Sequence, residues 1–303
     1  MRLQTELCGI KLSNPTVLAS GIMGITASSM GLIAENGAGA ITMKSINTEG
    51  KTGHPNPIAI TFDGGMLNAV GLPNKGIKET LEEIKEFKEQ CSAPLFASIF
   101  AQSVDEFAEL TKQLYKAQID AIEINISCPN CDDEFGKPFS CSPITAAKAT
   151  AACKEYAAVP LFVKLTPNVP NIQEIAKAVE AAGASAITAI NTVPGMMIDI
   201  HTRSPILFNK SGGLSGPAIK PIALKCVYDI YEAVKIPIIG TGGIMTGQDA
   251  IEMMMAGATV VGIGSAVYWR DIDVFKKVCR EMDVVLEKEG FTSVKEVVGL
   301  AHK

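Results

Sequence analysis

Short apolar segments alternate with longer amphipathic segments along this chain of 303 residues. Eight apolar segments have the length of β-strands, and they begin near Thr16, Ala40, Leu95, Ala121, Leu161, Ala186, Ile238 and Val260. Segments 104–117 and 172–182 between them have the pattern of amphipathic helices. Because alternating strands and helices build parallel sheets, eight such units predict one α/β domain over residues 1–303, a (β/α)8 TIM barrel.

The residues that precede the predicted strands repeat in pairs. Proline precedes the first, third, fifth and seventh strands, at Pro15, Pro94, Pro160 and Pro237. A Gly-Ala pair precedes the second, sixth and eighth strands, at 39–40, 183–184 and 257–258. Both are stop signals, since glycine caps a helix and proline cannot continue one. The alternation indicates an internal repeat of two units, which the fourth strand, preceded by residues 118–120, does not follow.

Composition restricts the partners of the chain. It is 47% hydrophobic and 19% charged, which suits a large buried core, and its net charge of −5 argues against nucleic acid or an anionic membrane as a partner. The first residues lack the apolar core of a signal peptide, and no apolar run is long enough to cross a bilayer, so a cytoplasmic protein is expected. Most of its eight cysteines are expected to be reduced, with Cys153, Cys226 and Cys279 buried as small hydrophobes in helices.

Small and polar residues follow the predicted strands. In a barrel of this kind, the chemistry lies at the C-terminal ends of the strands. Those ends read Ala19-Ser20-Gly21, Lys44-Ser45, Ser98, 125–128, 164–167, Asn191-Thr192, 240–243 and Gly264-Ser265. The sequence therefore predicts a functional site at this rim.

Two glycine-rich ends lie after the seventh and eighth strands, at Gly242-Gly243 and Gly264-Ser265. Glycine lets backbone N–H groups approach an anion, although either pair alone is also typical of a tight turn. Because both occur where TIM barrels bind phosphate, they predict phosphate-binding loops after strands seven and eight.

Two lysines and one cysteine are candidates for chemistry at the same rim. Lys44 and Lys164 directly follow apolar runs, where an unpaired ammonium is costly to bury, so both need anionic partners. A Schiff base is the rival role for either lysine. Cys128 lies in a loop with Pro129 and is a candidate base, because a nearby cation favours its thiolate.

Several ordered motifs carry a family resemblance from about Leu7 to Tyr268. They are 68–74 (NAVGLPN), 125–130 (NISCPN), 164–168 (KLTPN), 191–192 (NT), 212–216 (GGLSG) and 240–243 (GTGG). The chain resembles the class 1 dihydroorotate dehydrogenases, and segment 216–224 is similar to the B-type catalytic subunit. The resemblance implies FMN as cofactor, and a homodimer within a heterotetramer whose partner subunit carries FAD and an iron–sulfur cluster and passes electrons to NAD.

The same resemblance assigns roles to residues. It makes Cys128 the base that takes a proton from C5 of dihydroorotate, while a hydride leaves C6 for FMN and orotate forms in pyrimidine biosynthesis. The expected substrate contacts are Lys44, Asn68, Ala69, Val70, Gly71, Leu72, Asn125, Asn130, Asn191 and Thr192. Lys164 is expected at the flavin N1–O2 edge, and the other expected FMN contacts are Ser20, Lys44, Ser45, Ser98, Asn125, Ile190, Gly216, Gly242, Gly243, Gly264 and Ser265.

One segment departs from the family pattern. Residues 131–141 contain Cys131 and Cys141, where B-type relatives commonly have a cysteine-poor loop. Cys128 and Cys131 have a Cys-x-x-Cys spacing, so we hypothesise a reversible disulfide that disables the base; extra thiols without a role are the alternative. Cys141 with Asp132 or Asp133 is too weak a pattern for a metal site, and no metal is predicted.

Other functions remain open at this stage. One alternative is dihydroorotate oxidation linked to fumarate, and another is a reductase similar to dihydropyrimidine dehydrogenase, although segment 68–74 favours dihydroorotate. A third is a flavin-free lyase or isomerase that uses Lys164 as a Schiff base. The three histidines, His54, His201 and His302, lie in no nucleophile or metal motif, which argues against a Ser-His-Asp hydrolase.

Overall fold

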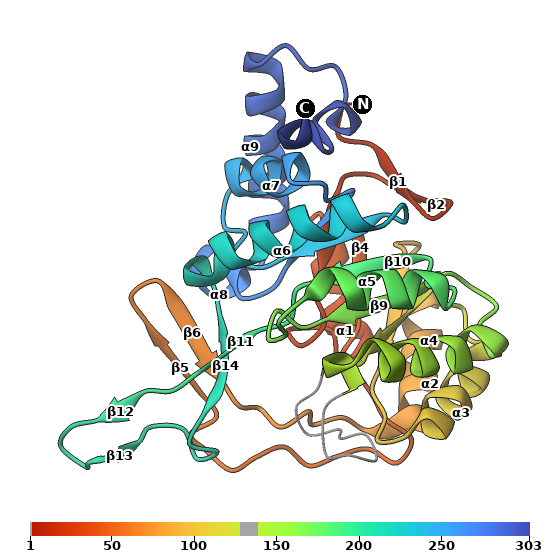
Figure 1. Cartoon of the computed structure of the whole chain (residues 1–303), viewed down its shortest axis with the longest axis vertical. Helices are drawn as coiled ribbons and strands as arrows, with labels where there is room; N and C mark the ends of the chain where they lie inside the picture. Colours follow the sequence, from red (N-terminus) through yellow and green to blue (C-terminus); the bar gives the residue numbers. More distant parts are fainter. Residues whose placement is uncertain (1, 128–138) are drawn as a thin grey trace.

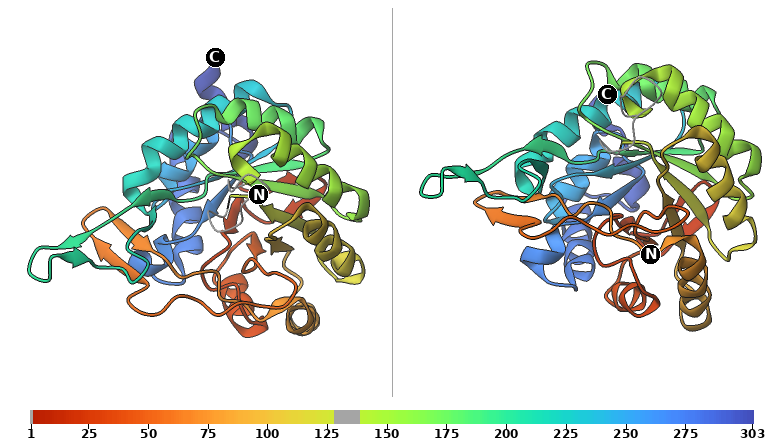
Figure 2. Two further views of the ribbon diagram at one scale, coloured as in Figure 1. Left: turned by 60° about the horizontal axis from the view of Figure 1, so that its bottom comes forward. Right: turned by 90° about the horizontal axis from the view of Figure 1, so that it is seen from below.

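A closed barrel of eight parallel strands forms the centre of the computed structural model, which describes residues 2–127 and 139–303 (Figures 1 and 2). The strands follow chain order around the barrel, and the last pairs with the first. They are β3 (Thr16–Leu18), β4 (Ala40–Thr42), β7 (Leu95–Ile99), β8 (Ala121–Asn125), β9 (Leu161–Leu165), β10 (Ala186–Ala189), β15 (Ile238–Thr241) and β16 (Val260–Ile263).

The predicted barrel is therefore confirmed. Each of the eight strands begins at the residue that the sequence predicts. The proline and Gly-Ala signals mark seven of these starts, all but that of β8. Six of the seven follow a helix, which either signal ends, and Pro15 instead follows the strand Ile10–Leu12.

Helices cover the outside of the barrel (Figure 2). In the described ranges they are α1 (Ala27–Glu35), α2 (Gly76–Gln90), α3 (Val104–Gln113), α4 (Pro143–Tyr156), α5 (Ile172–Ala181), α6 (Lys220–Ala233), α7 (Gly247–Met255), α8 (Ala266–Arg270) and α9 (Val274–Lys288). Short 3₁₀ helices are η1 (Leu114–Lys116), η2 (Phe139–Cys141), η3 (Pro217–Ile219), η4 (Val294–Val297) and η5 (Leu300–His302). The helix expected over 104–117 ends at Gln113 and continues as η1, since last turns often tighten to 3₁₀. Within the described ranges, no helix is long and apolar enough to cross a membrane.

An N-terminal hairpin closes the end of the barrel at which the strands begin, which we call the lower end; the upper end is the rim at which the strands finish. Strands β1 (Thr5–Leu7) and β2 (Ile10–Leu12) pair antiparallel, and Leu7 and Leu12 join the apolar cluster inside the barrel. Phe96 and Phe162 lie at the centre of this cluster, edge to face, with ring centroids 5.1 Å apart. Hydrophobic packing therefore seals one end of the barrel and leaves the other for the site.

An arm of short strands extends from the opposite rim and projects from the body (Figure 1). Its sheet has the order β11-β14-β6-β5, and a two-stranded hairpin, β12 with β13, lies beyond it. These strands are β5 (Ala59–Phe62), β6 (Gly65–Asn68), β11 (Val193–Gly195), β12 (Ile198–Asp199), β13 (Ser204–Pro205) and β14 (Gly212–Ser215). The sequence did not predict this arm.

The interior of the barrel changes character along the strands. Inward-facing residues of the lower layer are apolar: Val17, Ala40, Phe96, Ala121, Phe162, Ala186, Ile239 and Val260. Two residues further along the strands, on the same face, stand Thr42, Ser98, Glu123, Lys164, Thr188 and Thr241. The upper interior is therefore polar, which prepares the rim for a ligand.

Truncation of Phe162 tests the apolar lower layer. Phe162→Ala leaves a cavity at the centre of a fully buried cluster, so we expect it to lower the free energy of unfolding by about 3–5 kcal/mol. The exposed Tyr115 of η1 is the matched control, and Tyr115→Ala should change stability by less than about 0.5 kcal/mol. Denaturant unfolding measures both, and equal losses would contradict this account of the core.

Candidate active site

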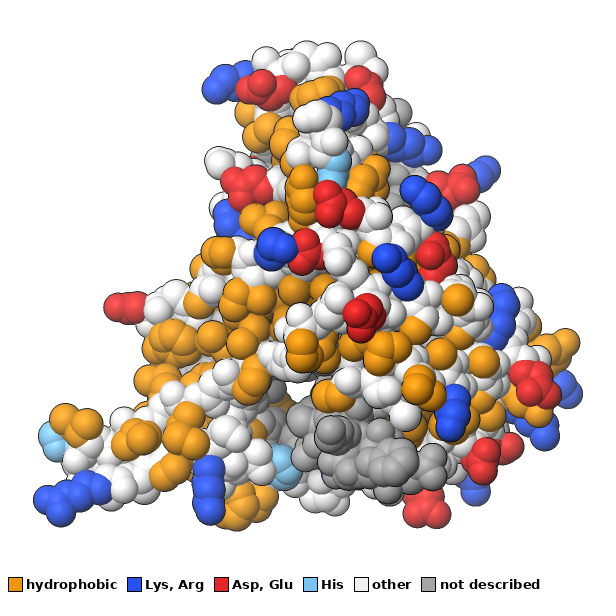
Figure 3. Space-filling view, in the orientation of Figure 1, with side chains coloured by type: hydrophobic (Ala, Val, Ile, Leu, Met, Phe, Trp, Pro, Cys, Tyr) orange, Lys and Arg blue, Asp and Glu red, His pale blue; other side chains and the backbone are white. Residues whose placement is uncertain are grey.

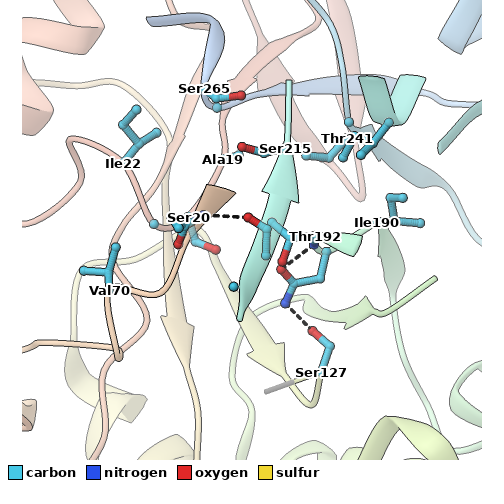
Figure 4. Close-up of a pocket in the computed structure, with 18 of the residues that line it drawn as sticks. Ala19, Ser20, Ile22, Val70, Ser127, Ile190, Thr192, Ser215, Thr241 and Ser265 are labelled. Carbon is cyan, nitrogen blue, oxygen red and sulfur yellow. Dashed lines mark hydrogen bonds between the residues drawn. The ribbon is translucent and has the colours of Figure 1, made fainter. Parts of the chain in front are cut away.

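A cavity of about 600 Å³ lies at the C-terminal ends of the barrel strands, beneath the arm. Its size is typical of ligand sites. It is lined by these residues from the sequence prediction: Ser20, Lys44, Ser45, Asn68, Ala69, Val70, Gly71, Leu72, Asn125, Lys164, Ile190, Asn191, Thr192, Gly216, Gly242, Gly243, Gly264 and Ser265. The structure thus brings together at one rim residues from every part of the chain (Figure 4).

Among the described residues, Ser98 is the one predicted site residue that does not line the cavity. Ser98 lies beneath its floor, fully buried, where its hydroxyl is 2.8 Å from that of Ser45. Ser98 therefore reaches the cavity through Ser45. Cys128 and Asn130 lie outside the described residues, as does the hypothetical Cys128–Cys131 disulfide.

Two buried ammonium groups share the cavity. Lys44 and Lys164 are 7% and 6% exposed, and Lys164 Nζ donates to Ser20 Oγ at 3.0 Å. Burial, together with the charge of Lys164, lowers the pKa of Lys44. Among the described lining residues there is no aspartate or glutamate. Since buried charges need partners of opposite sign, the cavity is built for an anionic ligand.

Three backbone N–H groups are available at the glycine-rich ends. Those of Gly243, Gly264 and Ser265 donate to no acceptor in the described part of the chain. The Ser265 hydroxyl does not cap α8, and Thr241 Oγ1 is buried and lines the cavity without a partner among the described residues. These unused donors suit the oxygens of a phosphate group.

Gly243 is required by the backbone at this place. Its φ is 72°, and a Cβ there would lie 2.7 Å from the backbone nitrogen of Lys220. Lys220 is in turn held by Asp249 at 2.6 Å and Glu252 at 2.8 Å, which fix the start of α6 against α7. A side chain at position 243 would therefore displace the loop that carries the free N–H group.

Amide and hydroxyl groups line the side of the cavity near β8 and β10. Asn191 Nδ2 donates to Ser127 Oγ at 2.7 Å (Figure 4). Ser127 Oγ in turn donates to Asn125 Oδ1 at 2.8 Å. Asn191 Oδ1 accepts from the backbone N–H of Thr192 at 2.8 Å. These bonds hold the amide planes in place, so that their remaining donors and acceptors are preset for a ligand.

The arm supplies the outer wall of the cavity. Strand β6 carries Asn68, whose Nδ2 donates to the Gly213 carbonyl of β14 at 3.4 Å. Gly213 also packs against the side chain of Thr192, where a Cβ would collide with the threonine hydroxyl. The arm thus places Asn68 and Thr192 beside each other.

Some lining residues were not selected from the sequence. They are His54, Ser127, Ser140, Cys141, Thr166 and Asn168, among others. Ser127, Thr166 and Asn168 stand within motifs at strand ends, so their position was a usable signal. His54 belongs to no motif; its Nδ1 contacts the Ala69 carbonyl at 3.0 Å, a contact that only the fold creates.

Of the three helical cysteines predicted to be buried, Cys153 is, whereas Cys226 and Cys279 are only partly buried. Cys153 is fully buried, and burial raises its pKa to about 12. Burial likewise raises the pKa of Cys226 and of Cys279 to about 11. A thiol with a raised pKa holds its proton and is a poor nucleophile, so these cysteines are structural.

Comparisons with known proteins agree with the geometry. A family model described as dihydroorotate dehydrogenase matches residues 2–286. Three similar relatives are each named dihydroorotate dehydrogenase B (NAD(+)), catalytic subunit. The protein of Methanocaldococcus jannaschii is 49% identical and covers 99% of this chain and 98% of its own length. The protein of Methanosarcina mazei is 47% identical and covers 99% of this chain and 96% of its own length. The protein of Pyrococcus furiosus is 43% identical, and the match covers both chains completely, at 100% each.

The lowered pKa of Lys44 gives the ligand-free protein a distinct pH dependence. The folded state releases the Lys44 proton more readily than the unfolded state, so the unfolded state binds more protons as pH rises toward the ordinary lysine pKa of 10.5. Stability contributed by this group therefore increases with pH. We expect wild type to gain stability relative to Lys44→Met in this range, as measured by denaturant unfolding. Parallel pH profiles would refute this account of Lys44.

Proposed function

Because this chain belongs to the dihydroorotate dehydrogenase family, we propose that it oxidises dihydroorotate to orotate, a step of pyrimidine biosynthesis, with FMN as its cofactor. The observation that carries the proposal is the cavity with two buried lysines and no acidic partner among its described lining residues. FMN and dihydroorotate both bring the negative charge that such a cavity requires.

The described residues fit FMN. Gly216, Gly242, Gly243, Gly264 and Ser265 line one end of the cavity, and the unused N–H groups there would hold the ribityl phosphate. Lys164, oriented by Ser20, would face the flavin edge and favour its negative charge on reduction. Ser45 and Ile190 also line the cavity as flavin contacts, with Ser98 supporting Ser45 from below. FMN, when bound, supplies the acceptor for the hydride that leaves C6 of the substrate.

The substrate would lie against the amide-lined side of the cavity. Lys44 would pair with its carboxylate, and the amides of Asn68, Asn125 and Asn191 would bond its ring amides, since asparagine both donates and accepts. Thr192 and residues 69–72 would complete this pocket, together with Asn130, which lies outside the described residues. These bonds hold the ring so that loss of the C5 proton and of the C6 hydride occurs in a fixed orientation.

Cys128 would take the C5 proton as general base. Its own position is outside the described residues, but its neighbour Ser127 is fixed by bonds to Asn125 and Asn191. Ser127, the last described residue before Cys128, therefore lies beside the amides proposed to bind the substrate. A thiolate at this place would be favoured by the charges of Lys44 and Lys164 in the same cavity.

A partner subunit would take the electrons onward. The relatives are named catalytic subunits and carry NAD(+) in their names, which supports an NAD-linked B-type assembly rather than fumarate as acceptor. We propose a partner with FAD and an iron–sulfur cluster, around a homodimer of this chain, in the cytoplasm. Exposed apolar side chains on the arm, Met196, Ile198, Ile200 and Phe208, support an interface there (Figure 3).

Gly243 tests the phosphate site. Gly243→Ala forces a side chain against Lys220 and shifts the loop, so the Kd for FMN should rise at least about tenfold, the value of one lost hydrogen bond to a charged group. Gly31→Ala is the matched control, because an added Cβ in α1 meets nothing within 4 Å. Fluorescence titration of the flavin-free protein gives both constants. An unchanged Kd in Gly243→Ala would place the phosphate elsewhere.

Anaerobic mixing with dihydroorotate tests the reaction and its base together. Wild type should bleach the visible absorbance of bound flavin, and Cys128→Ala should retain flavin but bleach about 10²–10⁴ times more slowly. Cys226→Ala, in α6 outside the cavity, should match wild type.

A wild-type flavin that stays oxidised would contradict the function and favour another pyrimidine as the substrate. A colourless protein that borohydride traps with substrate would support the Schiff-base alternative, and normal bleaching by Cys128→Ala would remove Cys128 as base.

A further inference from the structure

Glu123 is a buried carboxylate at the centre of the barrel. It is 2% exposed and is the one acidic residue that is fully enclosed within the described part of the chain. It stands on the inward face of β8, two residues after Ala121 and two before Asn125. It does not line the cavity. A carboxyl group buried here requires hydrogen-bond partners, because burial of an unpaired polar group costs free energy.

Both carboxylate oxygens of Glu123 accept hydrogen bonds. Ser98 Oγ donates to Oε1 at 3.0 Å, and Thr188 Oγ1 donates to Oε2 at 2.9 Å. Each hydroxyl has a single proton, so the protons of Ser98 and Thr188 are both committed to Glu123. Glu123 therefore fixes the direction in which Ser98 donates.

That direction passes to Ser45 and to Asn125. The hydroxyls of Ser45 and Ser98 are 2.8 Å apart, and because the Ser98 proton is committed, Ser45 must be the donor. Ser45 Oγ is then an acceptor for Asn125, whose Nδ2 lies 3.4 Å away. The nitrogen of the Asn125 amide consequently faces Ser45, and its oxygen faces the other way.

The same direction continues to the far side of the cavity. Ser127 donates to Asn125 Oδ1 at 2.8 Å and accepts from Asn191 Nδ2 at 2.7 Å. The five bonds from Asn191 through Ser127, Asn125, Ser45 and Ser98 to Glu123 all run from donor to acceptor. Hydrogen bonds in such a chain polarise and strengthen one another.

We propose that Glu123 is a positioning residue that acts through Ser98 and Ser45 to set the orientation of the Asn125 amide, and so presents an N–H donor of Asn125 to an anionic substrate. Asn191 is oriented by its own bond from the Thr192 N–H. Asn125 lines the cavity, and its Nδ2 has a second N–H that no described residue accepts. A flipped Asn125 amide would replace that N–H by an oxygen lone pair, which repels a carboxylate or a carbonyl oxygen. The inference rests on the proposed function and adds a residue beneath the site to it.

Glu123→Met tests the proposal. Methionine has similar length and volume but no strong acceptor, so Ser98 loses its terminal partner and turns its proton to Ser45, which reverses the chain. We expect the Kd of orotate for the FMN-loaded protein, measured by calorimetry, to rise at least about tenfold, as for one misdirected hydrogen bond to an anion. Ser98→Ala cuts the chain at the same link and should have the same effect, which keeps the test open if Glu123→Met does not fold.

Thr188→Val is the matched control. It removes the bond to the other oxygen of Glu123, leaves the chain through Ser98 intact and does not touch the cavity. Its orotate Kd should stay at the wild-type value, even if denaturation shows a loss of stability like that of Glu123→Met. A wild-type Kd in Glu123→Met or Ser98→Ala, or an equal rise in Thr188→Val, would overturn the proposal. Wild type that binds no orotate would instead overturn the proposed function.

Discussion

Two buried ammonium groups without an acidic partner are the constraint on which the site depends. Lys44 enters the cavity from the segment just after β4 and Lys164 from β9, and no described lining residue neutralises them. The ligand-free protein therefore carries an unfavourable charge arrangement, visible in the lowered pKa of Lys44. An anionic cofactor and an anionic substrate would neutralise the two lysine charges, so their binding would be favoured by the electrostatics of the barrel.

The barrel tolerates this charge because its two ends are built differently. The lower interior is sealed by Phe96, Phe162 and the N-terminal hairpin, and it supplies apolar burial. The upper interior holds hydroxyls and the Glu123 carboxylate, whose bonds continue to Asn125 and Asn191 at the cavity. The same strands thus serve both stability and recognition. One layer of inward-facing residues is apolar, and the next layer, two residues further along, is mostly polar.

The sequence predicted the barrel well because its signals are local. Proline and Gly-Ala pairs fix the strand starts, and small or polar residues at strand ends indicate the rim. Glu123 was missed because its role depends on Ser98 and Thr188, which come from two other strands. The arm was missed because strands such as β12 have two residues and no periodicity to detect. His54 reaches the cavity only through contacts with residues 69–71.

A crystal structure of the chain with FMN and orotate bound tests the central claim most directly. The account predicts the flavin phosphate on the N–H groups of Gly243, Gly264 and Ser265, the flavin edge at Lys164, and the orotate carboxylate paired with Lys44. Phosphate bound away from these loops, or orotate with no anionic group near either lysine, would contradict it.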